Sequence, residues 1–593
     1  MKLHSNPIAK LLWLTSALKV SLVLTGCASP QKDICESRVI FKSPQKIQFN
    51  KNEKLLLCGD PTKESWKDIP PAQAEFTVRS FLKQRAYYSP KFEYKDDLLW
   101  VDPGPLKTAT QLGYDGLPEH FNDIQIRDVI GKPLTSELLD RIEGQASARL
   151  KNLGYACPSV KLQASIETGE IHVFVTPGPK YIFQEPILKD DLGLYPKTMR
   201  RFDAFQLNAP YRYEWVKLSS NRGENDGIVI SSQYNYTCPA KPLQTLQIED
   251  LALIQQIMTG DHHLLTLGVG ASTEEFPIGQ MSLKSVRLND RGASLNTTLY
   301  GSQRIQKLSA TYTDYLFKNA PRFDLAPNAT ILHDVEQTYN ISKIQISSPL
   351  EYRGDLENHS WLSSFGPSLS RQYADSHSKA FTYFSLLGRL MMTSHDYELY
   401  ASDPRSGWSS EFNLEFLSEG FSAHPLAAVY RLSGSKLLQL NPVDPPQWIM
   451  GFRYALSSTL SQERPLTSTL LPPQYFNTLG GDQSLRGFGR NEVTGGPGYV
   501  GQMTSAYFGA EIRYAKTLLA GIEPFLFFDV GALGQSPFDL ESIIYYSPGT
   551  GIRWSTPFGA IRFTIAHGYL SKETIERKDR EHLQIFVSFG REF

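Results

Sequence analysis

Long apolar runs are scarce in this sequence of 593 residues. After an N-terminal stretch from Leu11 to Leu24, no segment reaches the roughly 18 consecutive apolar residues that a transmembrane helix needs. This scarcity excludes a membrane protein built of several transmembrane helices. Because lipid offers no partners for backbone hydrogen bonds, any later membrane span has to consist of strands closed into a barrel.

An excess of charge of one sign is also missing. Lysine and arginine number 60 against 61 aspartates and glutamates, so the formal net charge is -1. Without the basic excess that contacts to phosphate backbones require, nucleic acid is excluded as a partner. The sequence also lacks the signatures of serine hydrolases, zinc proteases and nucleotide-binding loops. It therefore predicts a protein that is not an enzyme, with no catalytic residues and no cofactor.

Cysteine is rare, with five residues in the whole chain. Setting aside Cys27 leaves Cys35, Cys58, Cys157 and Cys238, and no C-x-x-C spacing occurs, so no metal site is predicted. An even number of cysteines in an exported chain favours disulfides, for which three connectivities exist. We favour Cys35 with Cys58, a local pair, and Cys157 with Cys238, a pair that would join neighbouring domains.

The N-terminus has the features of an export signal. Lys2 and Lys10 precede the apolar stretch, and Leu24-Thr25-Gly26-Cys27 then forms a lipobox. We expect residues 1–26 to be removed and Cys27 to be acylated, which would tether the new N-terminus to a membrane. The alternative is an ordinary cleaved signal in which Cys27 is incidental; Lys19, which interrupts the apolar stretch, favours this alternative.

Residues from about 36 to 260 repeat a pattern of a strand, two helices and two strands, with a period of roughly 75 residues. Pro/Gly clusters at residues 102–105 and 177–179 end the first two copies. A capped, periodic apolar pattern predicts the longest helix in the second copy. The predicted helices are Ala72–Tyr88, Thr135–Leu153, Lys197–Phe205 and Tyr211–Ser219, and the third copy is expected to end with a strand over Gly227–Tyr236.

From about residue 263 the sequence changes to short segments in which apolar and polar residues alternate, separated by polar turns. About 330 residues at roughly 20 per strand and connection predict about sixteen strands, a size that bacterial barrels reach. In the strands Tyr507–Tyr514 and Phe525–Ala532, alternation places Glu511 and Asp529 on the lumen side and apolar residues on the lipid side. Leu583–Phe593 alternates in the same way.

The most specific local pattern is the glycine-rich stretch Gly480-Gly481-Asp482-Gln483-Ser484-Leu485-Arg486-Gly487-Phe488. A hydrophobic residue followed by Arg-Gly-Phe or Arg-Gly-Tyr is the loop-six signature of a superfamily of sixteen-stranded outer-membrane barrels with POTRA domains. This superfamily includes BamA, TamA and the two-partner secretion pores. The sequence resembles it over most of residues 100 to 593, and within it resembles TamA-like members, apparently as a lipoprotein variant.

The resemblance implies a membrane all-β protein, in which three α+β POTRA domains precede a transmembrane antiparallel β-barrel of about 16 strands. The expected boundaries are a signal peptide at 1–26, a tether at 27–36, POTRA domains at 37–105, 106–178 and 179–260, and the barrel at 261–593.

In the superfamily, loop six folds back into the lumen and its arginine meets acidic groups of the inner wall. The matching positions are Arg486 and its expected partners Glu511 and Asp529, which alternation independently assigns to the lumen. Unpaired burial of an arginine is costly, and the planar guanidinium suits bidentate pairing with a carboxylate. Arg486 either plugs and rigidifies the lumen or acts as a latch.

The first and last strands of the barrel are expected to meet at a seam. Gly268 and Gly270 weaken side-chain packing in the first strand, so this seam would open easily and expose backbone groups to a client strand. The alternative is that both glycines only relieve crowding in the lumen. The seam residues are Leu265, Leu267, Gly268, Val269 and Gly270 in the first strand, and Phe589, Gly590 and Phe593, which also form the insertion signal, in the last.

The sequence therefore predicts an assembly or translocation factor in the bacterial outer membrane, with its POTRA domains in the periplasm. Its expected partners are outer-membrane lipid, unfolded outer-membrane or secreted client proteins, and a TamB-like protein anchored in the inner membrane. The alternatives are a BamA-type general insertase or a two-partner secretion pore, and more remotely a passive porin or a surface lipoprotein.

Overall fold

A computed structural model describes residues 39–589 of the chain, apart from the gaps given at the end of this paragraph. The signal peptide and the predicted sites Cys27, Cys35, Gly590 and Phe593 lie outside the described residues, as does the side chain of Cys58. The chain forms two compact parts, one of residues 1–117, 126–145 and 160–175 and one of the remainder. The gaps are 43–46, 48, 59–70, 97, 119–128, 190–192, 196, 239–247, 338, 376–379, 401–403, 422–425, 441–446, 465–470, 497, 516–520, 557–558 and 572–582.

The first α+β module contains two helices and a three-stranded sheet. Its strand order is β1-β3-β2, with β1 parallel and β2 antiparallel to β3. Val78 and Leu82 from one helix are buried with Leu99 and Val101 from the central strand, because the apolar positions of each element share one face. The elements are β1 (Val39–Phe41), α2 (Lys51–Cys58), α3 (Pro71–Gln84), β2 (Lys91–Lys95) and β3 (Leu98–Asp102).

The second module repeats the three-stranded sheet, with the order β4-β6-β5. Its long helix matches the predicted one to within a residue at each end, since Thr135 caps it by accepting a hydrogen bond from the backbone N–H of Leu138. The elements are β4 (Gln111–Asp115), α4 (Ser136–Asn152), β5 (Ser159–Ala164) and β6 (Glu170–Thr176).

The third module corrects two predicted boundaries. The last helix continues to Asp226, where Gly227 ends it with a left-handed φ of 77°, so residues 227–230 are not part of a strand. The predicted helix over Lys197–Phe205 is instead a short 3₁₀ turn. The elements are β7 (Tyr181–Phe183), β8 (Ile187–Leu188), η3 (Thr198–Phe202), α5 (Tyr213–Asp226), β9 (Ser231–Asn235), β10 (Glu249–Leu251) and β11 (Ile254–Met258).

Two further strands, β10 and β11, follow the predicted last strand and complete the third module within its predicted boundary at residue 260. They pair in parallel with β7 and β8, so the chain returns to the edge at which the module began. Cys157 and Cys238 form a disulfide, the connectivity favoured from the sequence. This bond joins the segment after α4 to the segment after β9.

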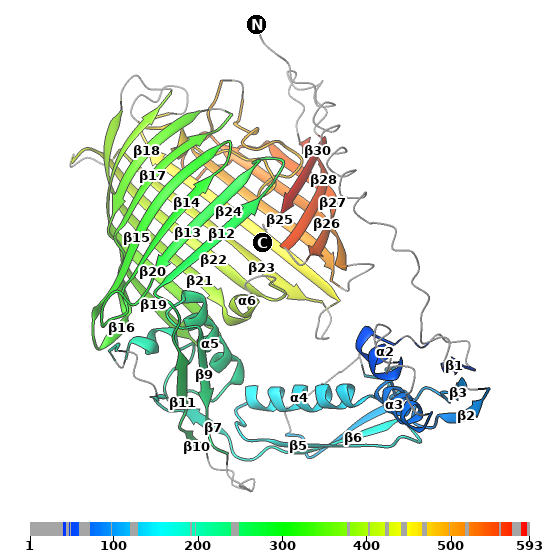
Figure 1. Cartoon of the computed structure of the whole chain (residues 1–593). Coiled ribbons are helices and arrows are strands. Elements are labelled where there is room, and N and C mark those ends of the chain that lie inside the picture. Colours follow the sequence, from blue (N-terminus) through cyan, green and yellow to red (C-terminus); the bar gives the residue numbers. More distant parts are fainter. Residues whose placement is uncertain are drawn as a thin grey trace. The chain divides into compact units, whose positions relative to one another are not determined.

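The C-terminal part is one antiparallel sheet that curls into a barrel (Figure 1). In the described residues its nineteen strands follow chain order. In each of the pairs β16/β17, β18/β19 and β28/β29, both members are bonded to the same neighbouring strand, so the pair is one interrupted strand. Counting each interrupted strand once gives sixteen strands, as the sequence predicts. Among the described residues, no helix has the length and apolar character needed to cross a membrane.

The barrel strands vary in length and are longest in the middle of the sheet. A short helix, α6 (His395–Leu399), follows β21, and a 3₁₀ turn, η4 (Pro473–Tyr475), lies between β24 and β25. The strands are β12 (His263–Gly270), β13 (Ile278–Ser285), β14 (Ser294–Gly301), β15 (Ile305–Phe317), β16 (Ala320–Leu325), β17 (Asn328–Val335), β18 (Asn340–Ser347), β19 (Leu350–Leu356), β20 (His359–Ala374), β21 (Phe381–Ser394), β22 (Gly407–Glu419), β23 (Ala427–Gln439), β24 (Trp448–Ser461), β25 (Thr504–Tyr514), β26 (Ile522–Gly534), β27 (Ile544–Thr556), β28 (Gly559–His567), β29 (Tyr569–Leu570) and β30 (Leu583–Phe589).

The strands alternate between an apolar outer face and a polar inner face. In β26 the side chains of Leu526 and Phe528 are exposed, whereas Phe527 and Asp529 are buried. Charges on the inner face meet partners and water, and the apolar outer band is suited to lipid. The predicted membrane all-β fold with α+β modules before the barrel is confirmed.

Candidate functional site

The connection between β24 and β25, residues 462–503, enters the barrel and is called loop six below. Among its described residues, Leu471, Tyr475, Leu485, Arg486 and Phe488 are buried, although most loops of a protein lie on its surface. The hydrogen bonds from Gly481 N to Phe488 O and from Phe488 N to Leu485 O fold its tip into a compact turn. Loop six therefore contributes part of the packed interior of the barrel.

Arg486 lies at the tip of loop six and its side chain is 0% exposed. Its Nε and Nη2 donate to the two carboxylate oxygens of Asp529 in β26, at 2.8 and 2.9 Å. Nη1 donates to Glu511 in β25 at 3.0 Å, and the guanidinium stacks over the ring of Phe527. The structure thus brings together the three residues that the sequence analysis grouped. Two carboxylates and a forked cation form the strongest class of protein hydrogen bonds.

Other side chains extend this cluster across the wall. Arg562 in β28 donates to the same Glu511 oxygen at 2.6 Å, and Arg513 approaches the other oxygen at 3.5 Å. The Tyr507 hydroxyl donates to Asp529 at 3.1 Å. Loop six is therefore fixed to β25, β26 and β28 through one charged network.

Glycines let loop six approach the wall closely. Gly480 has a φ of 113°, and a Cβ atom there would lie 2.1 Å from the carbonyl oxygen of Gly489, so only glycine fits this turn. A Cβ atom on Gly487 would lie 2.4 Å from the backbone nitrogen of Gly568, the residue between β28 and β29. The interruption of that strand therefore coincides with the point where the loop touches it.

Apolar residues on both sides of Arg486 anchor the tip. Leu485 and Phe488 are both 0% exposed and pack with Leu479 and Tyr507. The ring of Phe488 also contacts Tyr545 edge to face, with centroids 5.8 Å apart. Burial of these two side chains contributes about 2 kcal/mol each by the usual transfer values, which favours a seated loop.

The seam between the first and last strands is described where Ala271–Thr273 meet Val587–Phe589. β12 pairs with β13 over eight residues and β30 pairs with β28 over seven, but β12 and β30 are the two ends of the sheet. In the described residues they are joined by the bridge between Ser272 and Ser588 and by hydrogen bonds from Phe589 N to Ala271 O and from Thr273 N to Val587 O. Residues 590–593, which follow β30, lie outside the described residues.

The first strand presents an apolar row on its outer face, in which Leu267 is 71% and Val269 84% exposed and Leu265 is also exposed. Between these residues, a Cβ atom on Gly268 or Gly270 would come no closer than 3.6 Å to any neighbour. Crowding by the described residues therefore does not require these two glycines. This favours the interpretation in which they weaken packing at the seam.

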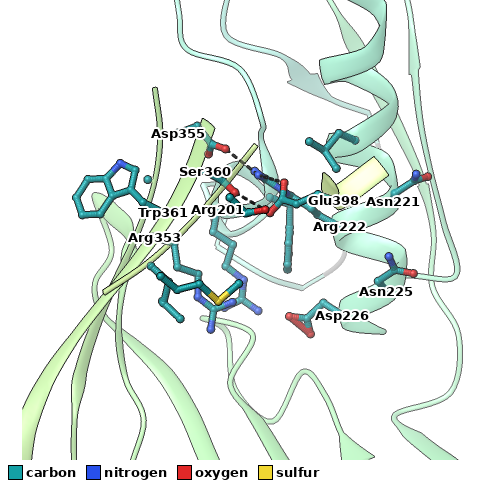
Figure 2. Close-up of a pocket in the computed structure, with 16 residues that line it drawn as sticks. Arg201, Asn221, Arg222, Asn225, Asp226, Arg353, Asp355, Ser360, Trp361 and Glu398 are labelled. Carbon is teal, nitrogen blue, oxygen red and sulfur yellow. Dashed lines mark hydrogen bonds and ion pairs between the residues drawn. The ribbon is translucent and has the colours of Figure 1, made fainter. Parts of the chain in front are cut away.

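A second polar cluster joins the third α+β module to the barrel and was not predicted from the sequence. Arg222 in α5 donates to Asp355 in β19 and to Glu398 in α6, both at 2.8 Å (Figure 2). Arg322 in β16 donates to the other Asp355 oxygen at 2.7 Å. Since Asp355 is almost fully buried, these guanidinium groups provide the charge that a buried carboxylate needs.

The backbone of Asp203 in the third module belongs to the same junction. Its carbonyl oxygen accepts a hydrogen bond from Arg322 at 2.7 Å, and burial raises the pKa of its carboxyl group to about 6. A cleft of about 520 Å³ adjoins the cluster. Figure 2 shows Arg201, Asn221, Asn225, Asp226, Arg353 and Trp361 around this cleft.

No local pattern marks the residues that the sequence analysis missed. Asp355 and Glu398 lie in unremarkable polar stretches, and their partners are far away in the chain. Arg562 could have been found by extending the alternation of β25 and β26 to β28, because it lies on the inner face with Glu511. Within the described residues, no group of histidine, cysteine and acidic side chains could hold a metal ion.

Comparisons with known proteins connect this geometry to a family. No curated protein matches the sequence. Among solved structures, BamA from Haemophilus ducreyi lacking POTRA domains 1–3 is 14% identical, with a TM-score of 0.49 over 82% of this chain and 100% of that one. CdiB from Acinetobacter baumannii is 11% identical, with a TM-score of 0.44 over 87% and 96%, and CdiB from Escherichia coli is 11% identical, with a TM-score of 0.45 over 86% and 94%.

A family match covers the whole barrel. The Omp85 superfamily domain matches residues 263–593, which begin at the first residue of β12. This span is more than half of the chain and includes loop six and both seam strands. It confirms the resemblance to the superfamily of outer-membrane barrels. The chain belongs to the Omp85 superfamily.

Proposed function

We propose that this chain is a TamA-like assembly factor, which receives unfolded clients on its α+β modules in the periplasm and inserts them through the barrel seam. As a member of the Omp85 superfamily, it is a bacterial outer-membrane β-barrel that inserts or secretes other proteins. Insertion through the seam and the TamA-like type are the parts that we propose. The seam itself is the observation that carries the proposal, because β12 and β30 are the two ends of the barrel sheet and contact each other there.

An edge strand of this kind is able to template another strand. When the bonds of Ala271–Thr273 to Val587–Phe589 break, β12 offers a row of free N–H and C=O groups beside an exposed apolar row. A client strand that pairs there satisfies its own backbone groups and turns its apolar side toward lipid. Client folding and apolar burial thus supply the driving force, and no nucleotide is consumed.

A disulfide across the seam tests the route. Ser272→Cys with Ser588→Cys places two thiols at the bridging pair, and oxidation should hold the seam closed. We expect oxidation to reduce assembly of an unfolded barrel client by about tenfold or more in proteoliposomes, since the edge of β12 can no longer separate, and a reductant to restore it. Protection of the client from protease measures assembly.

The matched control is a second pair of cysteines inside the sheet. Ser368 in β20 and Ser385 in β21 are opposed in register and buried, so Ser368→Cys with Ser385→Cys adds a cross-strand disulfide away from the seam. This variant should assemble clients equally well with and without reductant. Equal activity of the oxidised and reduced seam variant would argue against passage through the seam and in favour of a pore.

The proposal also includes a TamB-like partner and acylation of Cys27. Isolation of the full-length chain from native membranes should co-purify a long β-rich protein anchored in the inner membrane. In the same preparation, the N-terminal peptide should have the mass of an acylated cysteine, and Cys27→Ser should abolish the modification. Isolation without such a partner would favour a general insertase or a secretion pore, and an unmodified N-terminus would favour an ordinary signal peptide.

A further inference from the structure

Loop six makes a second set of charged contacts, on the opposite side of the seam from Arg486. Arg490, two residues after Phe488, donates from Nη2 and Nε to Glu336 at 3.0 and 3.3 Å. Its Nη1 lies 3.9 Å from Glu274 and 4.0 Å from Glu275. Glu336 and Glu275 are nearly fully buried, so these charges are weakly screened by solvent.

Glu274 and Glu275 belong to the turn that follows β12 and contains the seam residue Ser272. A backbone hydrogen bond from Ser272 N to Glu275 O and a bond from Glu275 N to the Ser272 side-chain Oγ close this turn, and Ser272 itself bridges Ser588 across the seam. Glu274 also accepts a hydrogen bond from the backbone nitrogen of Asp482 in loop six at 3.2 Å. Loop six therefore contacts the seam turn at two places, Asp482 and Arg490.

The same turn is fixed to the N-terminal strands. The hydroxyl of Tyr300 in β14 donates to Glu275 at 2.6 Å. Arg304, just before β15, donates to Glu336 and lies 3.8 Å from Glu275. Three acidic residues and two arginines thus connect β12, β14, β15 and β17 to one point of loop six.

Arg486 and Arg490 therefore bind residues on opposite sides of the seam. Arg486 is held by β25 and β26 and, through Glu511, by Arg562 of β28, which pairs with the last strand. Arg490 is held by acidic residues associated with the first strands. A cleft of about 430 Å³ lies between Arg490 and the inner side chains of Gln584 and Phe586 in β30, so side chains do not fill this part of the seam.

We infer that loop six is a brace that restrains the seam. Arg486 binds strands on the C-terminal side of the seam, and Arg490 binds residues next to strands on its N-terminal side. Arg490 is then a positioning residue that sets how easily the seam opens. This inference rests on the proposed function, because it gives the seam its restraint.

The test measures seam opening directly, on the purified full-length protein in proteoliposomes without any client. Ser588→Cys introduces a thiol at a position that is 3% exposed and bridged to Ser272, so a water-soluble maleimide reaches it only when the seam opens. Mass spectrometry of the labelled peptide separates this thiol from the native cysteines. In this background we compare Arg490→Ala with the parent.

Arg490→Ala should raise the labelling rate of the Ser588→Cys thiol about tenfold, which is the size of change typical of coupled charged contacts. Glu274→Gln, which weakens the other end of the same contact, should raise it by a smaller factor and covers the case in which Arg490→Ala folds poorly. Arg389→Ala is the control, because Arg389 pairs with Glu411 on the inner wall far from the seam. It should leave the rate unchanged.

Equal labelling rates in the parent, Arg490→Ala and Glu274→Gln would overturn the brace. The readout does not depend on client assembly, so the two ideas fail separately. A raised labelling rate together with full client assembly by the oxidised seam variant would keep the brace and remove the proposed route. An unchanged labelling rate together with loss of client assembly on seam oxidation would keep the proposed route and remove the brace.

Discussion

Replacing Arg486 with alanine is expected to lower the free energy of unfolding of the barrel by about 3 to 5 kcal/mol, the cost of breaking a buried ion pair from one side. The change leaves Asp529 buried with the Tyr507 hydroxyl and the backbone N–H of residue 486 as its remaining donors, while Glu511 retains Arg562. We also expect assembly of an unfolded client to fall at least tenfold, since the loop tip loses three of its bonds to the wall. Urea unfolding in liposomes and client protease protection measure the two effects.

The double variant Arg486→Ala with Asp529→Asn separates a plug from a latch. Neutralising Asp529 removes the uncompensated charge, so most of the lost stability should return. If Arg486 only fills and rigidifies the lumen, assembly should return with stability. If it holds loop six in its working position, assembly should stay low in a stable barrel, and this is the result that we expect from the three side-chain bonds that join Arg486 to Asp529 and Glu511.

Arg389→Ala is the matched control for charge removal. Arg389 and Glu411 also form an ion pair on the inner wall, but their side chains are 42% and 32% exposed. Exposed pairs contribute at most about 1 kcal/mol, so this variant should unfold and assemble clients almost as the parent does. A loss as large as that of Arg486→Ala would show that any inner-wall arginine is equally important.

Alternation and one motif were enough to predict the central contact of the site. Period-two patterning assigned Glu511 and Asp529 to the lumen because each strand turns its charges away from lipid. The loop-six motif, by its resemblance to a superfamily, supplied the residue that meets them. Alternation and the motif are different properties of the sequence, so their agreement makes the contact of Arg486 with Glu511 and Asp529 a specific prediction.

The contacts of Arg490 and Arg222 could not be predicted in this way. Each pairs with acidic residues more than a hundred positions away, on strands whose relative register is set by the closed sheet and not by local sequence. Nor does propensity fix where a helix stops: α5 continues past Ser219 to Asp226 because Gly227 provides the left-handed cap. Long-range pairing and cap geometry account for most of the differences between sequence and structure.

Replacing Gly487 with alanine should damage the site almost as strongly as loss of Arg486, without changing any charge. The added Cβ atom would lie 2.4 to 2.6 Å from backbone atoms of Gly568 and His567, which cannot rotate away as a flexible side chain can. Such overpacking costs about 2 to 3 kcal/mol or shifts the loop from its seat. Urea unfolding and client assembly again provide the measurements.

Gly279→Ala is the control for this substitution, because Gly279 lies in β13 and a Cβ atom there meets nothing within 4 Å. It should change the free energy of unfolding by less than about 0.5 kcal/mol. A large loss in Gly279→Ala would mean that barrel strands do not tolerate alanine in general, and the result at Gly487 would then say nothing about loop six.

Combining the two substitutions shows whether Gly487 acts through Arg486. The glycine is needed, in one case, only to bring the guanidinium to Asp529 and Glu511. The double variant Arg486→Ala with Gly487→Ala should then assemble clients as well as the less active of the two single variants, because the same contact is lost only once. If the losses instead multiply, Gly487 has a separate role at the interruption between β28 and β29, where Gly568 and the ring of Phe488 also meet. We expect the first result, because Arg486 and Gly487 are consecutive residues and the arginine cannot reach its carboxylates from a displaced tip.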